Sequence, residues 1–136
     1  HEEYDLAKAY YFGRQDYKTA DSLFQIVIDN DSTYVPSHIY RGRCNYKMDT
    51  NNENWMAFPH YLKVTEMVQT DDRLQPSKKP FVLEALRYVA DYYSKSNNKD
   101  LDKAKMYFEE ILIVEPNDPV AKRVLGVQDP APTTTP

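Results

Sequence analysis

The residue types that most often carry out chemistry are few in this chain, and their spacing does not bring them together. Three histidines and one cysteine occur among 136 residues. A zinc site needs such side chains to converge, yet His1, His38 and His60 include no pair at the spacing of two ligands on one helix. Cys44 follows His38 by six residues, which places the two on different faces of a helix. We therefore expect no metal, and we expect Cys44 to be a small buried thiol rather than a nucleophile.

Acid–base and phosphate chemistry also lack their usual residues. Acidic side chains occur as sequence neighbours, namely Glu2–Glu3, Asp71–Asp72 and Glu109–Glu110. Neighbours point about 100° apart on a helix, so these pairs do not converge on one atom as acid and base. Three isolated glycines cannot form a phosphate-binding loop. The sequence predicts no catalytic residue and no cofactor, and we expect no enzyme activity from this chain.

The overall charge argues against two classes of partner. The net charge is -4, and no basic run is longer than Lys78–Lys79. Binding to nucleic acid or to an anionic membrane surface needs clustered positive charge. No apolar run approaches the roughly 20 residues of a membrane helix. We expect neither nucleic-acid binding nor direct membrane insertion.

The elements that would position these side chains follow a repeated pattern. A small residue followed by large apolar residues recurs three times, as Ala20-x-x-Leu23-Phe24-x-x-Val27-Ile28, Ala57-x-x-x-Tyr61-Leu62-x-x-Thr65 and Ala104-x-x-Tyr107-Phe108-x-x-Ile111-Leu112. A shorter motif precedes each copy, as Leu6-Ala7-x-x-Tyr10-Tyr11, Arg41-Gly42-x-x-Asn45-Tyr46 and Val89-Ala90-x-x-Tyr93. This spacing is typical of amphipathic helices. Because a two-helix repeat cannot bury its apolar face alone, the copies must stack.

The pattern predicts helices over residues 3–12, 17–29, 36–48, 55–69, 81–94 and 101–114, with a short further helix at 119–126. Asp16 and Asp100 stand where a side chain would cap the following helix, and Gly13 would end the first helix in a left-handed conformation. Pro59 requires the regular part of its helix to begin close before it. Gly42 within a helix costs about 1 kcal/mol relative to Ala, which indicates a close packing contact there. The polar insert 70–79 would extend the preceding helix or bulge from one edge.

These residues resemble the tetratricopeptide repeat, a helix pair of 34 residues. The small residues of its first helix are matched by Ala7, Gly42 and Ala90, and the closing proline by Pro116. The small and aromatic pairs of its second helix are matched by Ala20/Phe24, Ala57/Tyr61 and Ala104/Phe108. The match is to repeat segments of larger bacterial proteins, so we interpret the chain as a fragment or mature segment from the cytoplasm or periplasm. The second repeat is degenerate, and the repeats are spaced by more than 34 residues.

The resemblance implies an all-α, right-handed α-solenoid of about three antiparallel helix pairs. We expect one domain over residues 1–126, with repeats at 3–34, 35–70 and 80–116 and a partial capping helix at 117–126. Residues 127–136 are rich in Pro and Thr and are predicted to be a disordered tail.

In this family the first helices of the pairs line a concave groove that binds a peptide or a helix of a partner. Carried onto this chain, the groove positions are Tyr4, Lys8, Tyr11, Ile39, Arg43, Tyr46, Lys47, Arg87, Asp91 and Lys95. The set is basic and aromatic, which favours an acidic or C-terminal peptide segment as ligand. The alternative is that these residues form solvated helix faces. The carboxylate-binding Asn of the family's chaperone-binding members is missing, so that type of clamp is not predicted.

The function predicted is therefore a protein–protein interaction scaffold or adaptor. A structural alternative is a spacer within a longer repeat array, whose exposed ends contact neighbouring repeats and self-associate when isolated. A third is enzymatic, with a catalytic domain elsewhere in the parent protein or an unusual site in this chain. The sequence does not identify the partner or the oligomeric state.

Overall fold

The computed structural model describes residues 2–128 and contains only helices, turns and loops over that range. Its helices are α1 (Glu2–Lys8), α2 (Tyr17–Asn30), α3 (Val35–Met48), α4 (Phe58–Met67), α5 (Lys79–Lys95), α6 (Leu101–Val114) and α7 (Pro119–Leu125). A π-helical turn, Ala9–Arg14, continues α1, and short 3-10 turns cover Thr50–Asn52 and Thr70–Asp72. Most of the tail predicted to be disordered, residues 129–136, lies outside the described residues, as does His1.

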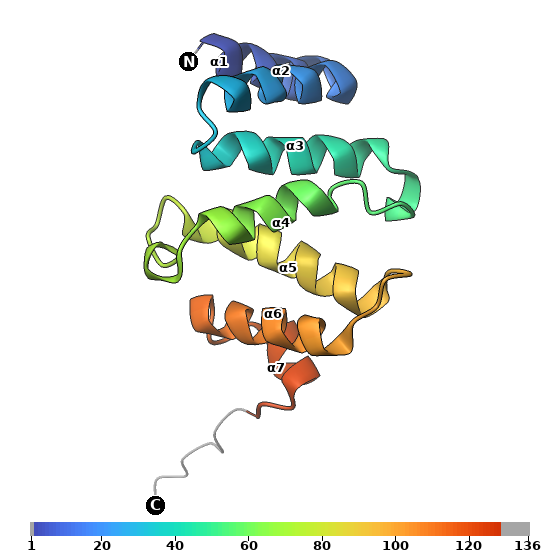
Figure 1. Cartoon of the computed structure of the whole chain (residues 1–136), viewed down its shortest axis with the longest axis vertical. Coiled ribbons are helices and arrows are strands. Elements are labelled where there is room, and N and C mark those ends of the chain that lie inside the picture. The colour runs from blue at the N-terminus through green and yellow to red at the C-terminus, as the bar shows by residue number, and fades with distance from the viewer. Residues whose placement is uncertain (1, 129–136) are drawn as a thin grey trace, which may run out of the picture.

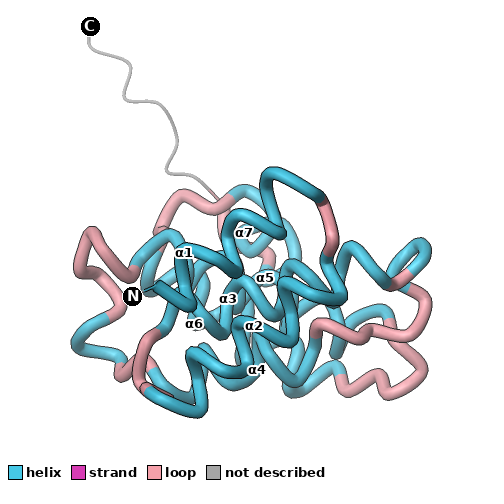
Figure 2. The backbone as a smooth tube through the Cα atoms, turned by 90° about the horizontal axis from the view of Figure 1, so that it is seen from above, coloured by secondary structure: helices cyan, strands magenta, loops and turns pink. Residues whose placement is uncertain are grey.

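The helices form a single stack in which each is packed on the next along the chain (Figure 1). Consecutive helices run in opposite directions, so α1 with α2, α3 with α4 and α5 with α6 form three helix pairs. The view along the stack shows these helices overlying one another, with the connecting loops at its two sides (Figure 2). The predicted all-α fold of stacked helix pairs is confirmed.

Two helix N-termini are capped by the side chains predicted to do so, whereas one predicted helix end is wrong. Asp16 and Asp100 cap α2 and α6 as predicted, since their carboxylates accept hydrogen bonds from the backbone N–H groups of Thr19 and Lys103, both at 3.1 Å. The prediction for Gly13 is wrong. Gly13 lies inside the π-helical turn, and Gln15 is the left-handed residue that ends it, with φ of 52°. The extra residue per turn of a π-helix carries the chain past the glycine before it reverses.

The second helix of the second repeat, α4, begins at Phe58, directly before Pro59, because proline is tolerated in the first turn of a helix but not in its interior. The insert after this helix bulges from the stack, one of the two outcomes expected, and its Arg73 is buried. The Arg73 guanidinium donates to the carbonyl oxygens of Thr65 (2.9 Å) and Val68 (3.1 Å). These carbonyls lack partners within the helix, so the insert completes the C-terminal end of α4.

The core consists of two separate clusters of buried side chains. The larger joins α4, α5, α6 and α7 with one face of α3, and its fully buried members include Ile39, Val64, Val82, Leu86, Val89, Ile111 and Val114. The smaller joins α1, α2 and α3 through Ala7, Ala20, Phe24 and Cys44, with tyrosines packed around it. Phe24 and Phe108 occupy the same repeat position in the two clusters. Helix α3 therefore lies between two cores.

Gly42 of α3 marks the closest approach between helices of the second pair. A Cβ atom built there would lie 2.9 Å from the Tyr61 ring of α4. The predicted close contact is therefore confirmed. Cys44 is fully buried, as expected, and burial raises the pKa of its thiol to about 12.

Candidate functional site

A cavity of about 550 Å³ lies between α3 and α5. We call it the α3–α5 hollow. It is closed on one side by the loop that joins α3 to α4. Its lining residues are Tyr46, Asn52, Trp55, Tyr61, Pro80, Glu84, Arg87, Tyr88 and Asp91. The lining combines aromatic rings with two carboxylates and one guanidinium, which is a surface suited to a polar or charged ligand group.

The loop that closes the hollow is held by one buried carboxylate. Asp49 is 4% exposed and accepts hydrogen bonds from the backbone N–H groups of Asn54 (3.1 Å) and Met56 (3.0 Å). Burial raises the pKa of Asp49, but these hydrogen bonds outweigh it, so its pKa lies below the usual value. Trp55 has φ of 52°, a left-handed conformation that is strained for a bulky residue. The loop thus holds the indole ring at the hollow in a fixed, costly conformation.

Three aromatic rings meet at the hollow around Tyr88. The centroids of Tyr46 and Tyr88 are 6.3 Å apart with an interplanar angle of 83°, and those of Trp55 and Tyr88 are 5.5 Å apart at 68°. The Tyr88 hydroxyl donates to the Asn52 side-chain oxygen at 2.7 Å, and burial raises the pKa of this hydroxyl. Tyr46 remains 50% exposed. Its ring is therefore available to a partner, while Tyr88 is fixed beneath it.

Arg43 and Glu84 connect α3 to α5 next to the hollow. The guanidinium donates two hydrogen bonds to the carboxylate, from Nε at 2.9 Å and Nη2 at 2.6 Å. The Tyr61 hydroxyl donates to the same carboxylate at 2.7 Å, and burial together with the Glu84 charge raises the pKa of Tyr61. Arg43 also lies over the Tyr40 ring, 5.0 Å from its centroid. The sequence predicted that the Arg43 guanidinium binds a ligand. In the structure it is instead hydrogen-bonded to Glu84.

The other predicted basic groups are also paired, with one exception. Arg87 donates to Asp118 at 2.7 and 3.2 Å. Lysine and carboxylate pairs join Lys95 to Asp91 at 3.6 Å and Lys8 to Asp5 at 3.9 Å. Lys47 is exposed, and no ion pair described for residues 2–128 includes it. The two guanidinium groups of the expected basic surface are therefore held by carboxylates, whereas the lysines form long, exposed pairs, which are weak, or none.

The structure brings part of the predicted groove set together. Tyr46, Arg87 and Asp91 line the α3–α5 hollow itself. Tyr4 and Tyr11 contact the other side of α3, with centroids 6.1 and 5.3 Å from that of Tyr40.

Two members of the set do not fit a ligand surface as expected. Ile39 is fully buried in the larger cluster, so its assignment to the groove is wrong. The α-helix turns it toward α4 and α5 because it begins the apolar stripe of α3. Lys8 lies over the Tyr4 ring at 4.7 Å and packs on α1 itself. Sequence reasoning also missed Asn52, Trp55, Glu84 and Tyr88, whose positions follow from the loop and from helix packing rather than from a motif.

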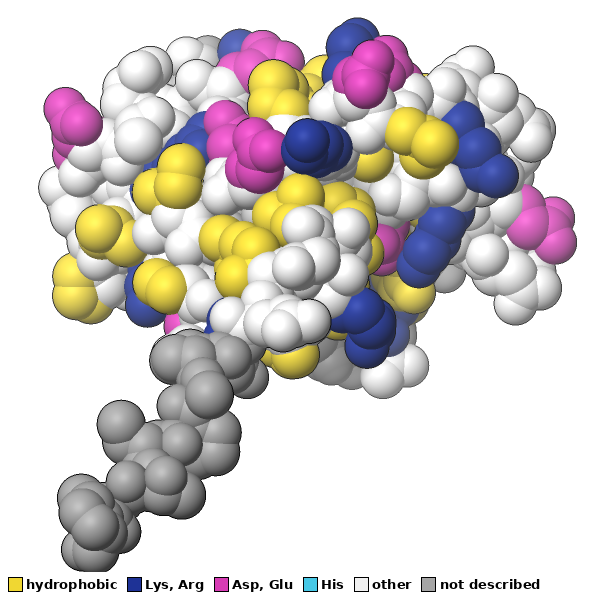
Figure 3. Space-filling view, turned by 90° about the horizontal axis from the view of Figure 1, so that it is seen from below, with side chains coloured by type: hydrophobic (Ala, Val, Ile, Leu, Met, Phe, Trp, Pro, Cys, Tyr) yellow, Lys and Arg dark blue, Asp and Glu magenta, His cyan; other side chains and the backbone are white. Residues whose placement is uncertain are grey.

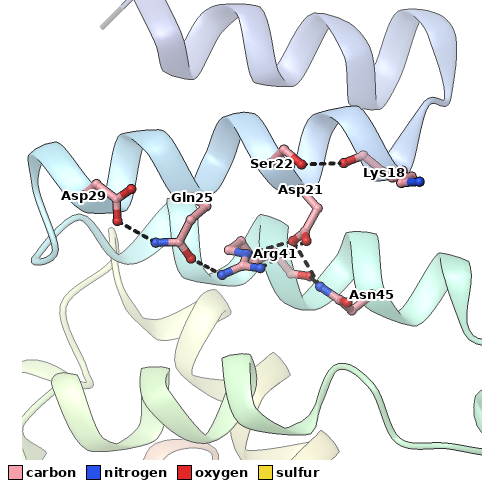
Figure 4. A network of polar contacts seen from close by, with 7 residues as sticks. All are labelled: Lys18, Asp21, Ser22, Gln25, Asp29, Arg41 and Asn45. Carbon is pink, nitrogen blue, oxygen red and sulfur yellow. Dashed lines mark hydrogen bonds and ion pairs between the residues drawn. The ribbon is translucent and has the colours of Figure 1, made fainter.

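A second polar network lies between α2 and α3, on the side of α3 that carries Arg41 (Figure 4). Arg41 donates to both carboxylate oxygens of Asp21, at 2.8 and 3.0 Å, and to Gln25. The Asn45 amide donates to Asp21 at 3.0 Å. These side chains satisfy one another, so the network ties two helices and offers no open ligand position.

Within residues 2–128, no three His, Cys, Asp or Glu side chains gather in a way that could hold a metal ion. No helix of the described part is both long enough and apolar enough to cross a membrane.

Comparisons with known proteins support the fold. No protein-family model matches the sequence, and no curated protein matches it. A crystal structure of the C-terminal part of a TPR repeat-containing protein from Cytophaga hutchinsonii is similar to it, with a TM-score of 0.78 and 29% sequence identity over 90% of this chain. The match covers 45% of that chain, so this chain spans less than half of its length. The fold is that of a tetratricopeptide-like helical repeat.

Proposed function

We propose that this tetratricopeptide-like stack is a protein-interaction module that holds a segment of a partner along α1, α3 and α5. The observation that carries the proposal is the α3–α5 hollow of about 550 Å³, with the half-exposed Tyr46 at its edge. Tyrosine and tryptophan are enriched where proteins bind one another, since their rings bury a large area with few rotatable bonds. Helical repeats present such surfaces along the stack.

Aromatic contacts extend the proposed surface beyond the hollow. Tyr11 contacts Tyr40, Arg43 lies over Tyr40, and Tyr61 contacts Tyr88 with centroids 4.8 Å apart. The proposed surface therefore runs from α1 to α5 across three helices. An extended peptide or a helix of several turns is long enough to follow it.

The test is selection of binding peptides from a random-sequence display library, followed by affinity measurement on a double variant. Tyr46→Ala/Lys47→Ala truncates two exposed residues, adds no new charge and breaks no described ion pair. Arg43→Glu is a poor choice because it would set a second carboxylate against Glu84. We expect selected peptides to lose at least tenfold in affinity for the double variant.

The matched control is Ile26→Ala/Lys18→Ala on α2, where both residues are exposed. This control should leave affinity within about twofold of wild type. Equal loss in both variants, or no loss in either, would contradict the proposed surface.

A second candidate function is a spacer within a longer repeat array. The end of the stack exposes apolar side chains, with Leu101 70% and Val124 53% exposed beside a cavity of about 390 Å³. The view of this end shows hydrophobic side chains in its middle (Figure 3). Light scattering separates the two functions: the spacer predicts that the average mass rises with protein concentration and that Leu101→Ser abolishes the rise.

A further inference from the structure

The α3–α5 hollow has no free positive charge. Arg87 lines it but has its charge compensated by Asp118, and Arg43 beside it is compensated by Glu84. Such short, two-point pairs hold both partners in place. An anionic group inside the hollow would have to displace one of these carboxylates before it reached either guanidinium.

Negative charge at the hollow is less completely compensated. Asp91 lines it, and its partner Lys95 is 3.6 Å away on a side chain that is 67% exposed. A pair of this kind on an exposed helix surface is weak. Asp49 lies behind the hollow, held by N–H groups, and no ion pair described for residues 2–128 includes it. Its charge acts at Tyr88, where it adds to the effect of burial in raising the hydroxyl pKa.

The aromatic rings at the hollow are arranged in a way that suits a cation. Tyr46 and Trp55 each meet Tyr88 edge to face, at 83° and 68°. In an edge-to-face contact, one ring points its edge at the face of the other. Both faces of that first ring stay free of this contact. The face of an aromatic ring carries partial negative charge and attracts ammonium and guanidinium groups, most strongly for tryptophan.

We infer that the α3–α5 hollow binds a lysine or arginine side chain of the partner segment, with Tyr46, Trp55 and Tyr88 around the cation and Asp91 facing it. This inference rests on the proposed function and names the chemistry of the ligand group. It replaces the acidic segment expected from sequence, because that expectation counted Arg43 and Arg87 as free charges. Tyr46 and Trp55 supply the ring contacts, and Asp91 supplies the opposite charge.

The experiment uses the same random-peptide selection on the wild-type chain, followed by titration of chosen peptides. Trp55 is the only tryptophan, so its fluorescence reports directly on the hollow. For each peptide, the central Lys or Arg is replaced in turn by Gln, norleucine and Glu. We expect selected peptides to be enriched in Lys or Arg and each replacement to weaken binding at least tenfold.

Protein variants separate the ring contacts from the charge. Tyr46→Leu and Asp91→Asn are each expected to weaken binding of the Lys peptide three- to tenfold, whereas Tyr46→Phe keeps the ring and most of the affinity. Tyr10→Leu and Asp102→Asn are the matched controls, since both lie outside the hollow lining. They should leave affinity within about twofold of wild type.

Each outcome decides between the two proposals. Peptides enriched in Asp or Glu, or indifferent to loss of their cation, that still lose affinity for Tyr46→Ala/Lys47→Ala would overturn the cation inference and leave the binding surface standing. Failure to select any peptide that depends on this surface would overturn both. Enrichment in Lys or Arg with loss of affinity in Asp91→Asn supports both.

Discussion

The two ends of the stack carry the same sequence pattern but bury very different cores. Ala20 with Phe24 in α2 and Ala104 with Phe108 in α6 occupy equivalent positions, and all four are buried. Around Phe108 the buried cluster spans five helices, α3 to α7, whereas around Phe24 it reaches three other residues and is surrounded by tyrosines. A repeated motif thus sets the helix pairing, while the residues outside the motif set how much apolar surface each pair buries.

Helix α3 joins these unequal parts through polar side chains on two of its faces. Arg41 binds α2 through Asp21, and Arg43 binds α5 through Glu84. Partly buried ion pairs add little net stability, since desolvation offsets their attraction, but they fix which groups face each other. The hollow lies on this polar junction, next to Arg43. The binding surface therefore belongs to the junction rather than to either core.

The largest expected effect separates the two cores directly. Phe24→Ala and Phe108→Ala each remove a buried ring at a cost of about 3–5 kcal/mol. Because its cluster is small, Phe24→Ala should expose α1 and α2 to hydrogen exchange while α5 and α6 stay protected. Phe108→Ala should lower protection throughout the stack. Amide exchange by mass spectrometry measures both, and equal loss everywhere in the two variants would show that the cores act as one.

The junction should respond to acid. Burial, aided by Arg41, lowers the pKa of His60 in α4 to about 4, against about 6.5 when unfolded. Between these values the unfolded chain binds the proton more readily, so the free energy of unfolding falls as pH drops from 6.5 to 4. The expected loss is on the order of 2 kcal/mol, since partial exposure screens part of the shift.

Urea unfolding at several pH values measures this loss, and His60→Gln is the comparison variant. It should flatten much of the decline over this range. His38 contributes the remainder, since burial lowers its pKa as well. An unchanged decline in His60→Gln would place the acid sensitivity elsewhere.

The contact between α3 and α4 predicts a smaller effect. Gly42→Ala gains about 1 kcal/mol of helix propensity. The new Cβ, however, would lie 2.9 Å from the buried Tyr61 ring, whose hydroxyl is hydrogen-bonded to Glu84. Overpacking costs about 1–3 kcal/mol, so the variant should be destabilised by about 1 kcal/mol in thermal unfolding. Gly13→Ala, where no atom lies within 4 Å, is the control and should be stabilised or unchanged.

The smallest effects come from the matched helix caps. Asp16→Ala and Asp100→Ala each remove a side-chain acceptor of a first-turn N–H, at about 1 kcal/mol each. If the smaller cluster, around Phe24, is the less stable of the two, Asp16→Ala should increase amide hydrogen exchange mainly in α1 and α2. Asp100→Ala should shift the midpoint of global unfolding. A shift of the global midpoint by Asp16→Ala, with only local exchange caused by Asp100→Ala, would contradict the expected order of stability of the two clusters.

Much of the fold was predictable because it depends on local signals. Helix periodicity, Asp caps and the Pro59 limit each act within a few residues, and the bounds of α6 agree with the predicted 101–114. The π-helical turn was not predictable, since nothing in its sequence distinguishes it from an α-helix before Gln15.

The candidate site was less predictable because its properties come from pairing across helices. Family positions located Tyr46, Arg87 and Asp91 at the hollow. They could not show that Arg43 is held by Glu84, a residue 41 positions away. They also could not show Trp55, which reaches the hollow through a strained loop. To predict the charge of a binding surface, one therefore needs to know the partner of each charged side chain as well as its residue type.

The most direct test of the proposed function is mapping a selected peptide on the protein by amide chemical-shift perturbation. If the α3–α5 hollow binds the partner, the largest shifts will fall on residues near Tyr46, Trp55, Tyr88 and Asp91, with the Trp55 indole N–H among them. Residues of α6 and α7 near Leu101 and Val124 will stay within the range of unbound protein. Shifts concentrated at that end of the stack, with none at the hollow, would contradict the proposal and favour the spacer function.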